Sequence, residues 1–189
     1  MAAGTTTSRA PDARFLLSHP AHFVALGFGS GLAPRAPGTF GTLAALGLYW
    51  LLALALPPLA IAFVAIPLFF LGIWAAERTA RDLGVQDHGA IVIDEIAAFL
   101  PLAALASVNW VPAAAGTTAS FSDSLPELAV AFGLFRLFDI WKPPPIRLLE
   151  QRLKGGFGVM FDDLVAACYA YVVLIVVIVV QQKFFPGEL

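Results

Sequence analysis

Five apolar stretches, each long enough to form a helix, constrain the fold of this 189-residue chain more than any other feature. They cover residues 42–56, 59–76, 91–108, 126–140 and 164–181. A helix that crosses a bilayer needs about 20 predominantly apolar residues, and about 17 is the lower limit. The second and fifth stretches meet this length, whereas the other three are short or carry charge near one end. We therefore expect an all-α fold, a small polytopic membrane bundle with about four to five membrane helices.

The composition supports a membrane protein and excludes several functional classes. Hydrophobic residues make up 59% of the chain, which is above the roughly 45–50% of soluble domains. The net charge of −2 offers no bulk basic surface for nucleic acid. The single cysteine, Cys168, cannot form an internal disulfide or a cysteine-based metal site, and its apolar surroundings predict a buried side chain. Nothing in the sequence indicates an obligate protein partner.

The chain is expected to form one domain with short tails. The N-terminal region contains two arginines but no continuous apolar segment, because histidines and a proline interrupt it. This pattern predicts a flexible tail over residues 1–20, followed by an interfacial segment, and not a cleaved signal peptide. A single membrane domain over residues 21–183 and a C-terminal tail over 184–189 complete the predicted organisation.

The positive charges predict which helix ends face the cytoplasm. If all five stretches cross the membrane, the N-terminal tail and the segments 77–90 and 141–163 share one side. Lys183 alone among the basic residues falls on the other side. By the positive-inside rule, the first side is cytoplasmic. The basic residues at this side or its boundary are Arg9, Arg14, Arg35, Arg78, Arg81, Arg136, Lys142, Arg147, Arg152 and Lys154.

The same topology gathers the polar motifs of the chain at the cytoplasmic face. Two of them, DHGAIVIDE and GGFGVMFDD, place acidic residues at the starts of the third and fifth apolar stretches. A third, FRLFDIWKPPPIR, ends the fourth stretch, and GFGSGLAPRAPGTFGT leads into the first. Segments far apart in the sequence are therefore expected to converge on one site at the membrane interface.

Two pairs of adjacent carboxylates, Asp94–Glu95 and Asp162–Asp163, are the strongest candidates for a metal site. Mg²⁺ takes oxygen ligands, commonly one or two carboxylates together with water and substrate phosphate oxygens. Adjacent helical residues differ in direction by about 100°, so one member of each pair suffices as a direct ligand. The alternative is that these acids only stabilise helix N-termini, with Asp163 as an N-cap. Two pairs together with Asp139 on one predicted face favour a function.

Several cations near these acids are candidates for phosphate binding. Arg136 and Asp139 are three residues apart, so they share a helix face and are expected to form an ion pair. Lys142 and Arg147 suit a phosphate group, the lysine as a point charge and the arginine through paired hydrogen bonds. Contact with anionic lipid headgroups is the alternative for both side chains. Lys154 is expected to be a solvated surface residue.

The glycine-rich motif and one histidine are weaker candidates. The glycines leave backbone N–H groups accessible near the start of a predicted helix, and Thr39 or Thr42 lies beside them. A helix N-terminus of this kind favours the binding of anions. The GxxxxGK[ST] spacing of a phosphate loop is absent, and glycines that allow close packing explain the segment equally well. His88, beside Asp87, has the chemistry of a general acid or base, but a surface position is the simpler interpretation.

In their order and spacing, these four motifs closely resemble the phosphatidylglycerophosphatase A family of bacteria. The resemblance extends from about Gly27 to Ala170. It implies a small all-helical membrane enzyme. Together with the apolar stretches and the positive-inside rule, it predicts a protein that crosses the bacterial cytoplasmic (inner) membrane several times, with its active face toward the cytoplasm. The implied reaction is Mg²⁺-dependent hydrolysis of the terminal phosphate of phosphatidylglycerophosphate, a membrane phospholipid, which yields phosphatidylglycerol.

Residue chemistry and this resemblance together give the expected roles. A carboxylate, Asp94 or Asp163, would orient the attacking water, and His88 would protonate the departing glycerol oxygen. An aspartyl-phosphate on Asp139 or Asp162 is the covalent alternative. The expected catalytic residues are His88, Asp94, Asp139 and Asp163, and the expected metal ligands are Asp94, Glu95, Asp162 and Asp163. The expected substrate-binding residues are Thr39, Arg136, Lys142 and Arg147.

Two other functional classes stay open at this point. A small membrane carrier also places carboxylates in helices, although carriers bind substrate near the midplane and commonly show repeat symmetry, and the sequence indicates neither. A non-catalytic assembly factor would use its cations to bind lipid and its carboxylates as helix caps. The substitution Asp94→Asn separates the enzyme from the assembly factor, because only the enzyme would lose an activity.

Overall fold

The computed structural model describes residues 10–85, 88–108 and 124–184. Every regular element in these ranges is a helix, with eight α-helices and one 3-10 helix. The predicted all-α class is therefore confirmed. The outermost parts of both predicted tails, the segment 109–123 and Asp87 lie outside the described residues.

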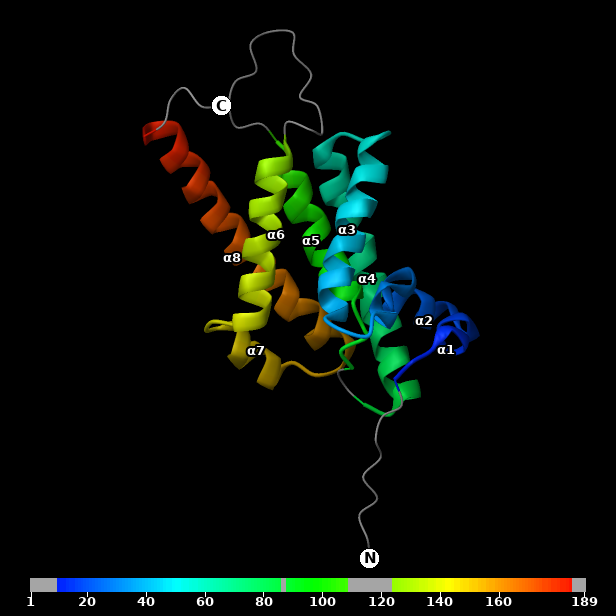
Figure 1. Ribbon diagram of the computed structural model, residues 1–189. Helices are drawn as coiled ribbons and strands as arrows, with labels where there is room; N and C mark the ends of the chain where they lie inside the picture. The colour runs from blue at the N-terminus through cyan, green and yellow to red at the C-terminus, as the bar shows by residue number, and fades with distance from the viewer. Residues whose placement is uncertain (1–9, 86–87, 109–123, 185–189) are drawn as a thin grey trace, which may run out of the picture.

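Five long helices coincide with the five apolar stretches (Figure 1). They are α3 (Pro37–Ala53), α4 (Pro58–Leu83), α5 (Ile93–Ala106), α6 (Leu125–Trp141) and α8 (Gly155–Phe184). Four short helices are α1 (Ala13–Ser18), α2 (Pro20–Ala25), η1 (Gly27–Leu32) and α7 (Ile146–Arg152). Helices α1, α2 and α7 lie at the same end of the bundle in Figure 1. Because α1 falls before residue 20, helical structure begins inside the segment expected to be a flexible tail.

Proline and glycine set several helix ends. Pro37 and Pro58 begin α3 and α4, where a missing N–H leaves no helical hydrogen bond unmade. Gly84 ends α4 in the left-handed conformation, with φ of 72°. Lys142 ends α6 in the same region, with φ of 46°, which is uncommon for a residue with a side chain. The chain turns sharply there before α7 begins.

Helix α5 forms the centre of the bundle. It packs against α3, α4, α6 and α8, which surround it in Figure 1. The side chains of Phe99 and Leu100 are completely buried, and the Phe99 ring meets the edge of Phe132 from α6 with 5.9 Å between ring centroids. Because the first turn of α5 contains Asp94 and Glu95, the same central position carries two carboxylates to one end of the core.

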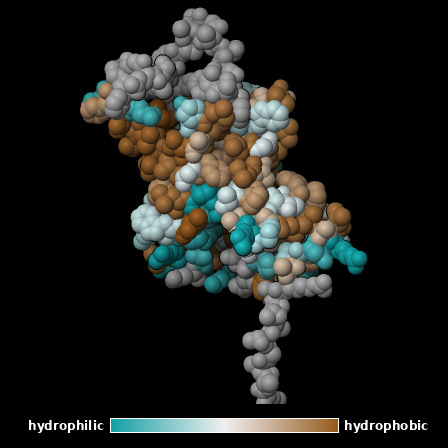
Figure 2. All heavy atoms as spheres, in the orientation of Figure 1, coloured by the Kyte–Doolittle hydropathy of each residue, from teal (hydrophilic) through white to brown (hydrophobic). Residues whose placement is uncertain are grey.

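The outward surfaces of the long helices are apolar. Leu59, Phe63 and Phe70 of α4 are 62%, 60% and 66% exposed. Figure 2 shows hydrophobic side chains over the upper part of the bundle, whereas hydrophilic side chains gather at the lower part, toward α1, α2 and α7. Helices α4 and α8 are long and apolar enough to cross a membrane, as the second and fifth apolar stretches predicted. Lipid on these surfaces explains the exposure, so the fold indicates a membrane location.

The position of Cys168 corrects one expectation. Its side chain on α8 is exposed and not buried. The prediction was wrong because an apolar neighbourhood in the sequence indicates burial only in a soluble protein. A membrane helix that is apolar on every side has lipid-facing residues as well as core residues.

Candidate active site

The acidic pairs of α5 and α8 meet at one end of the bundle. One carboxylate oxygen from each of Asp94, Glu95 and Asp163 lies within 4.8 Å of the other two. We call these three residues the acidic cluster. Glu95 and Asp163 are 8% and 4% exposed, and Asp94 is partly exposed. Three carboxylates at this spacing repel one another, so a cation between them would be strongly favoured.

Two carboxylate oxygens without a hydrogen-bond partner among the described residues make the acidic cluster suitable for binding a metal ion. Glu95 Oε2 and Asp163 Oδ2 are buried and have no hydrogen-bond partner among the described residues. Buried carboxylate oxygens normally have a partner, and hard cations such as Mg²⁺ take oxygen ligands of this kind. The acidic cluster could therefore hold a metal ion.

The two acidic pairs share a backbone contact but differ in orientation. Asp94 Oδ1 accepts a hydrogen bond from the Glu95 N–H at 3.1 Å. Asp162 Oδ1 likewise accepts from the Asp163 N–H at 3.2 Å. Both members of the first pair reach the acidic cluster, whereas Asp162 directs Oδ2 toward Lys142. Both acids of the α5 pair therefore lie in the acidic cluster, whereas only Asp163 of the α8 pair does, and which of them bind a metal stays a prediction.

Arg136 lies between the acidic cluster and Asp139. Its Nη1 is 2.7 Å from Asp139 Oδ2 and 3.7 Å from Glu95 Oε1. The first contact is the ion pair expected from the three-residue spacing, although Nη1 makes no well-aligned hydrogen bond. Arg136 Nε is also buried without a hydrogen-bond partner among the described residues. The guanidinium group therefore retains donors for a further acceptor.

Lys142 connects α7 and α8 beside the acidic cluster. Its Nζ donates to Asp162 Oδ2 at 2.7 Å and to Glu150 Oε1 at 3.0 Å. Partial burial of the ammonium group opposes its charge, but the hydrogen bonds and charges of the two carboxylates outweigh this effect. The pKa of Lys142 is therefore held above its usual value. The lysine is charged at neutral pH and offsets part of the negative charge next to the cluster.

The glycine-rich motif packs tightly against this site. A Cβ atom on Gly38 would overlap Glu95 Oε1 and would lie 3.1 Å from both terminal nitrogens of Arg136. A Cβ atom on Gly31 would overlap the backbone carbonyl oxygen of Ala90. Of the two explanations left open by the sequence, close packing is the one that these contacts support.

Three predicted site residues make no side-chain contact with the acidic cluster within the described part of the chain. Thr39 lies in the first turn of α3 and is partly exposed. Arg147 is exposed, and its Nη2 donates to the Trp141 carbonyl at 3.4 Å. His88 Nδ1 accepts a hydrogen bond from the Ala90 N–H at 3.1 Å. Contact of these residues with a substrate therefore stays a prediction.

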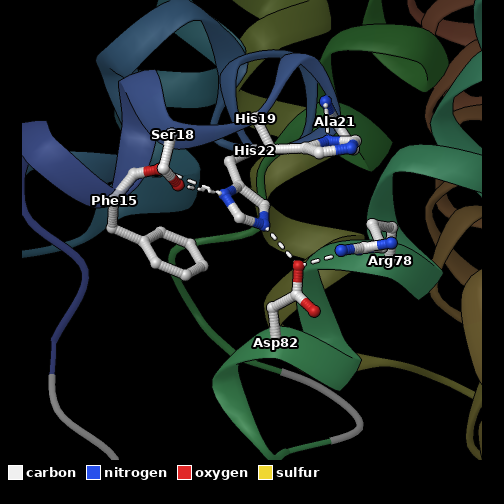
Figure 3. A network of polar contacts seen from close by, with 7 residues as sticks. All are labelled: Phe15, Ser18, His19, Ala21, His22, Arg78 and Asp82. Atoms are coloured by element: carbon white, nitrogen blue, oxygen red, sulfur yellow. Dashed lines mark hydrogen bonds and ion pairs between the residues drawn. The ribbon is translucent and has the colours of Figure 1, made fainter.

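Sequence reasoning missed a histidine that attaches the N-terminal helices to α4. His22 is 4% exposed, and its Nε2 lies 2.8 Å from Asp82 Oδ2 (Figure 3). Arg78 Nε donates to the same oxygen at 2.8 Å. The His22 ring stacks on Phe15 with 4.0 Å between centroids, and its Nδ1 lies 3.0 Å from Ser18 Oγ. No local pattern indicated this contact, because His22 and Asp82 are 60 positions apart.

Fold and site together define a class: a helical membrane protein with an acidic, metal-capable site beside fixed cations. Comparison with known proteins identifies the particular family. The sequence profile of the family PgpA, Phosphatidylglycerophosphatase A, matches residues 23–178. The chain belongs to the phosphatidylglycerophosphatase A family. The predicted family, activity and enzyme class, a phosphoric monoester hydrolase, are thereby confirmed by homology.

Individual relatives agree with this assignment. The chain is 42% identical over 171 residues to the phosphatidylglycerophosphatase A of Haemophilus influenzae, covering 89% of the chain and 94% of the relative. It is 41% identical over 154 residues to that of Escherichia coli K12, covering 81% and 80%. A protein of Bacteroides thetaiotaomicron named putative phosphatidylinositol-3-phosphatase is 35% identical over 161 residues, covering 81% and 90%. No solved structure gives a significant match.

Proposed function

We propose that the chain hydrolyses the terminal phosphomonoester of phosphatidylglycerophosphate at the acidic cluster, with Mg²⁺ as cofactor. The observation that carries this proposal is the meeting of Asp94, Glu95 and Asp163 within 4.8 Å at one end of an apolar bundle. A phospholipid presents its phosphate at the depth of the helix ends, not at the bilayer midplane. An acidic site at that depth can therefore act on a lipid that stays in its leaflet.

The proposed setting is the cytoplasmic face of the bacterial inner membrane. Helices α4 and α8 cross the bilayer, and the shorter α3, α5 and α6 complete a bundle of about four to five membrane helices. Basic residues gather at the end that holds α7 and the acidic cluster, which fits the positive-inside rule. Leu17 of α1 and Phe23 of α2 are exposed apolar side chains, as suits helices that lie in the interface.

The chain's own charged residues would bind and orient the phosphate. When bound at Asp94, Glu95 and Asp163, Mg²⁺ would supply positive charge to the phosphate oxygens. Lys142 has three N–H donors and uses two of them on carboxylates, so one remains for substrate. Arg136 retains its Nε donor. Fixed donors of this kind stabilise the charge on the transferred phosphoryl group.

We propose other roles for three of the predicted site residues, Asp162, Thr39 and Arg147. Asp162 is predicted as a metal ligand, but its Oδ2 is engaged by Lys142, so we propose that it orients this lysine. Thr39 and Arg147 are partly or fully exposed near the same end, which suits contacts with the outer part of the headgroup.

Hydrolysis forms one oxygen–phosphorus bond and breaks another. Asp94 or Asp163 would accept a hydrogen bond from the attacking water, whose oxygen bonds to phosphorus as the glycerol oxygen leaves. The carboxylate would take up the proton that the water loses, and His88, as an imidazolium, would donate a proton to the leaving oxygen. A ring protonated on both nitrogens has no acceptor, so Nδ1 would then give up the contact with the Ala90 N–H that this structure shows. Attack by Asp139 or Asp162, through an aspartyl-phosphate, is the covalent alternative.

Phosphate release by the detergent-purified protein tests the proposal. Phosphatidylglycerophosphate is supplied with Mg²⁺ or with a chelator, and metal-dependent release is expected. Asp94→Asn should lower the rate at least about 100-fold, because a group aligned with the reacting atoms is lost. Glu77→Gln, which changes an exposed carboxylate of α4, is the matched control and should retain the wild-type rate.

Two outcomes would contradict the proposal. One is the absence of phosphate release from folded protein in every divalent metal tried, which would favour the membrane-carrier interpretation over the enzyme. The other is preferred hydrolysis of phosphatidylinositol 3-phosphate, which is included as a competing substrate because one relative carries a name of that kind. Thermal unfolding of each variant shows whether a lost rate reflects a lost fold.

A further inference from the structure

A pocket lies beside the acidic cluster, where α7 leads into α8. Its volume is about 190 Å³, and its lining includes Glu150, Leu153, Lys154, Val159 and Asp162. A water-sized group occupies about 30 Å³ of a liquid, so the pocket has room for about six such groups. A three-carbon polyol, with three carbons and three oxygens, has that size.

Asp162 connects this pocket to the acidic cluster. Its side chain lines the pocket, whereas the next residue, Asp163, belongs to the cluster. Asp162 is also bound to Lys142 at 2.7 Å, so the lysine proposed to bind phosphate lies at the boundary between the two sites. A ligand with its phosphate at the cluster would extend naturally into the pocket.

The pocket lining offers three kinds of contact. Glu150 uses Oε1 to bind Lys142 at 3.0 Å, which leaves its second oxygen as an acceptor for a hydroxyl group. Lys154 is exposed and has no hydrogen-bond or ion-pair partner among the described residues, so its ammonium group is available to an anion. Leu153 and Val159 provide apolar surface for carbon-bound hydrogens. A polyol joined to an anionic phosphodiester satisfies all three kinds of contact.

We infer that this pocket binds the glycerol between the two phosphates of the lipid headgroup. Glu150 accepts a hydrogen bond from the glycerol hydroxyl, and Lys154 contacts the phosphodiester. The inference rests on the proposed function, because it takes the terminal phosphate to lie at the acidic cluster. It makes Glu150 and Lys154 specificity-determining residues, which favour lipids with a polyol between two phosphates.

Steady-state kinetics with phosphatidylglycerophosphate in detergent micelles test the inference. Lys154→Gln and Glu150→Gln each remove a charge-assisted contact with the part of the substrate that does not react. KM should rise about tenfold in each variant. In Lys154→Gln kcat should stay within about twofold, because the contact is made equally in the ground and transition states. Lys183→Gln, at the other end of α8, and Glu77→Gln are the charge-matched controls and should change neither constant.

A competition experiment separates polyol binding from the binding of phosphate alone. Glycerol 1-phosphate reaches both the cluster and the pocket, whereas inorganic phosphate reaches only the cluster. Glycerol 1-phosphate should inhibit the wild type about tenfold more strongly than phosphate, and Glu150→Gln should lose this difference. Equal inhibition of the wild type by the two anions would overturn the inference.

The remaining outcomes are distinguishable. If Glu150 acts only by holding Lys142, Glu150→Gln will lower kcat and leave KM unchanged, which would overturn its role in polyol binding. An unchanged KM in Lys154→Gln, with an active wild type, would overturn the assignment of the phosphodiester contact. A wild type that releases no phosphate at all would instead refute the proposed function.

Discussion

Replacing Gly38 with alanine tests whether the glycine-rich motif shapes the acidic cluster. The added methyl group would overlap Glu95 Oε1 and would lie 3.1 Å from the terminal nitrogens of Arg136. Gly47, on the same helix α3, has no atom within 4 Å of the corresponding position. Gly38→Ala and Gly47→Ala are therefore a matched pair, in which the same chemical change meets either the site or open space.

Two opposing effects set the stability of Gly38→Ala. Alanine is favoured over glycine within a helix by about 0.5–1 kcal/mol, whereas overpacking costs about 1–3 kcal/mol. The atoms that must move are the ends of the flexible Glu95 and Arg136 side chains and not backbone. The free energy of unfolding is therefore expected to fall by about 0–2.5 kcal/mol, or at most about 5–10 °C in Tm for a chain of this size.

The expected effect on catalysis is much larger. The oxygen that the methyl group displaces belongs to Glu95, a member of the acidic cluster. A displacement of about 1 Å at a reacting centre can cost about 100-fold in rate. We expect Gly38→Ala to lower kcat about 100-fold, and Gly47→Ala to keep the wild-type kcat with equal or slightly higher stability.

Phosphate release and thermal unfolding, measured on the same detergent preparations, check these values. A Gly38→Ala protein as active as Gly47→Ala would show that Glu95 either moves freely or has no part in the reaction. A loss of activity that follows unfolding in proportion would equally contradict the argument, because the predicted effect is local to the site.

Three further predictions concern contacts outside the acidic cluster. Gly31→Ala should unfold the protein or lower its stability by about 3 kcal/mol, because its methyl group would overlap the immobile carbonyl of Ala90; a Tm close to that of the wild type would contradict this. His22→Ala should lower the free energy of unfolding by about 1–3 kcal/mol, since it removes the contact with Asp82, and an unchanged denaturation midpoint would show that α1 and α2 are held by packing alone. Because the pKa of Lys142 is raised in the folded state, its charge stabilises the fold below the usual lysine pKa of about 10.4 and loses that effect as the pH rises through the folded value. Lys142→Met should therefore show a constant loss of stability between about pH 6 and 9, and a loss that disappears within this range would refute the ion pairs.

The length and placement of the apolar stretches were sufficient to predict the five long helices, but not the short helices α1, α2, η1 and α7. Each apolar stretch became one long helix. The largest boundary differences are at the start of α8 and the end of α4, where polar residues and glycines continue the helix beyond the apolar stretch. The acidic pairs were also informative, because ionisable residues in an apolar chain are rarely placed without a partner. Arg136 and Asp139 were predicted as an ion pair because their contact lies within one helix.

Contacts between distant segments could not be predicted in the same way. Glu150 reaches Lys142 across the turn between α6 and α7, and the left-handed backbone at Lys142 that allows this has no unambiguous sequence signal. The attachment of His22 to Asp82 depends on how two helices pack, and so does the approach of Gly38 to Glu95. Periodicity gives the face of each helix but not which neighbour that face meets.

The two consecutive carboxylates of α8 make the length of the chain before them critical. Asp162 meets Lys142 while Asp163 joins the acidic cluster, and about 100° of helical rotation separates their directions. One residue inserted after Gly158 would move Asp162 into the direction of the cluster and turn Phe161 toward Lys142. One residue deleted there would place Asp163 beside Lys142, which keeps a carboxylate partner, but would bring the apolar Leu164 to the acidic cluster. The number of residues in the first turns of α8 therefore sets both contacts. A single insertion removes the carboxylate from Lys142, and a single deletion removes one from the acidic cluster.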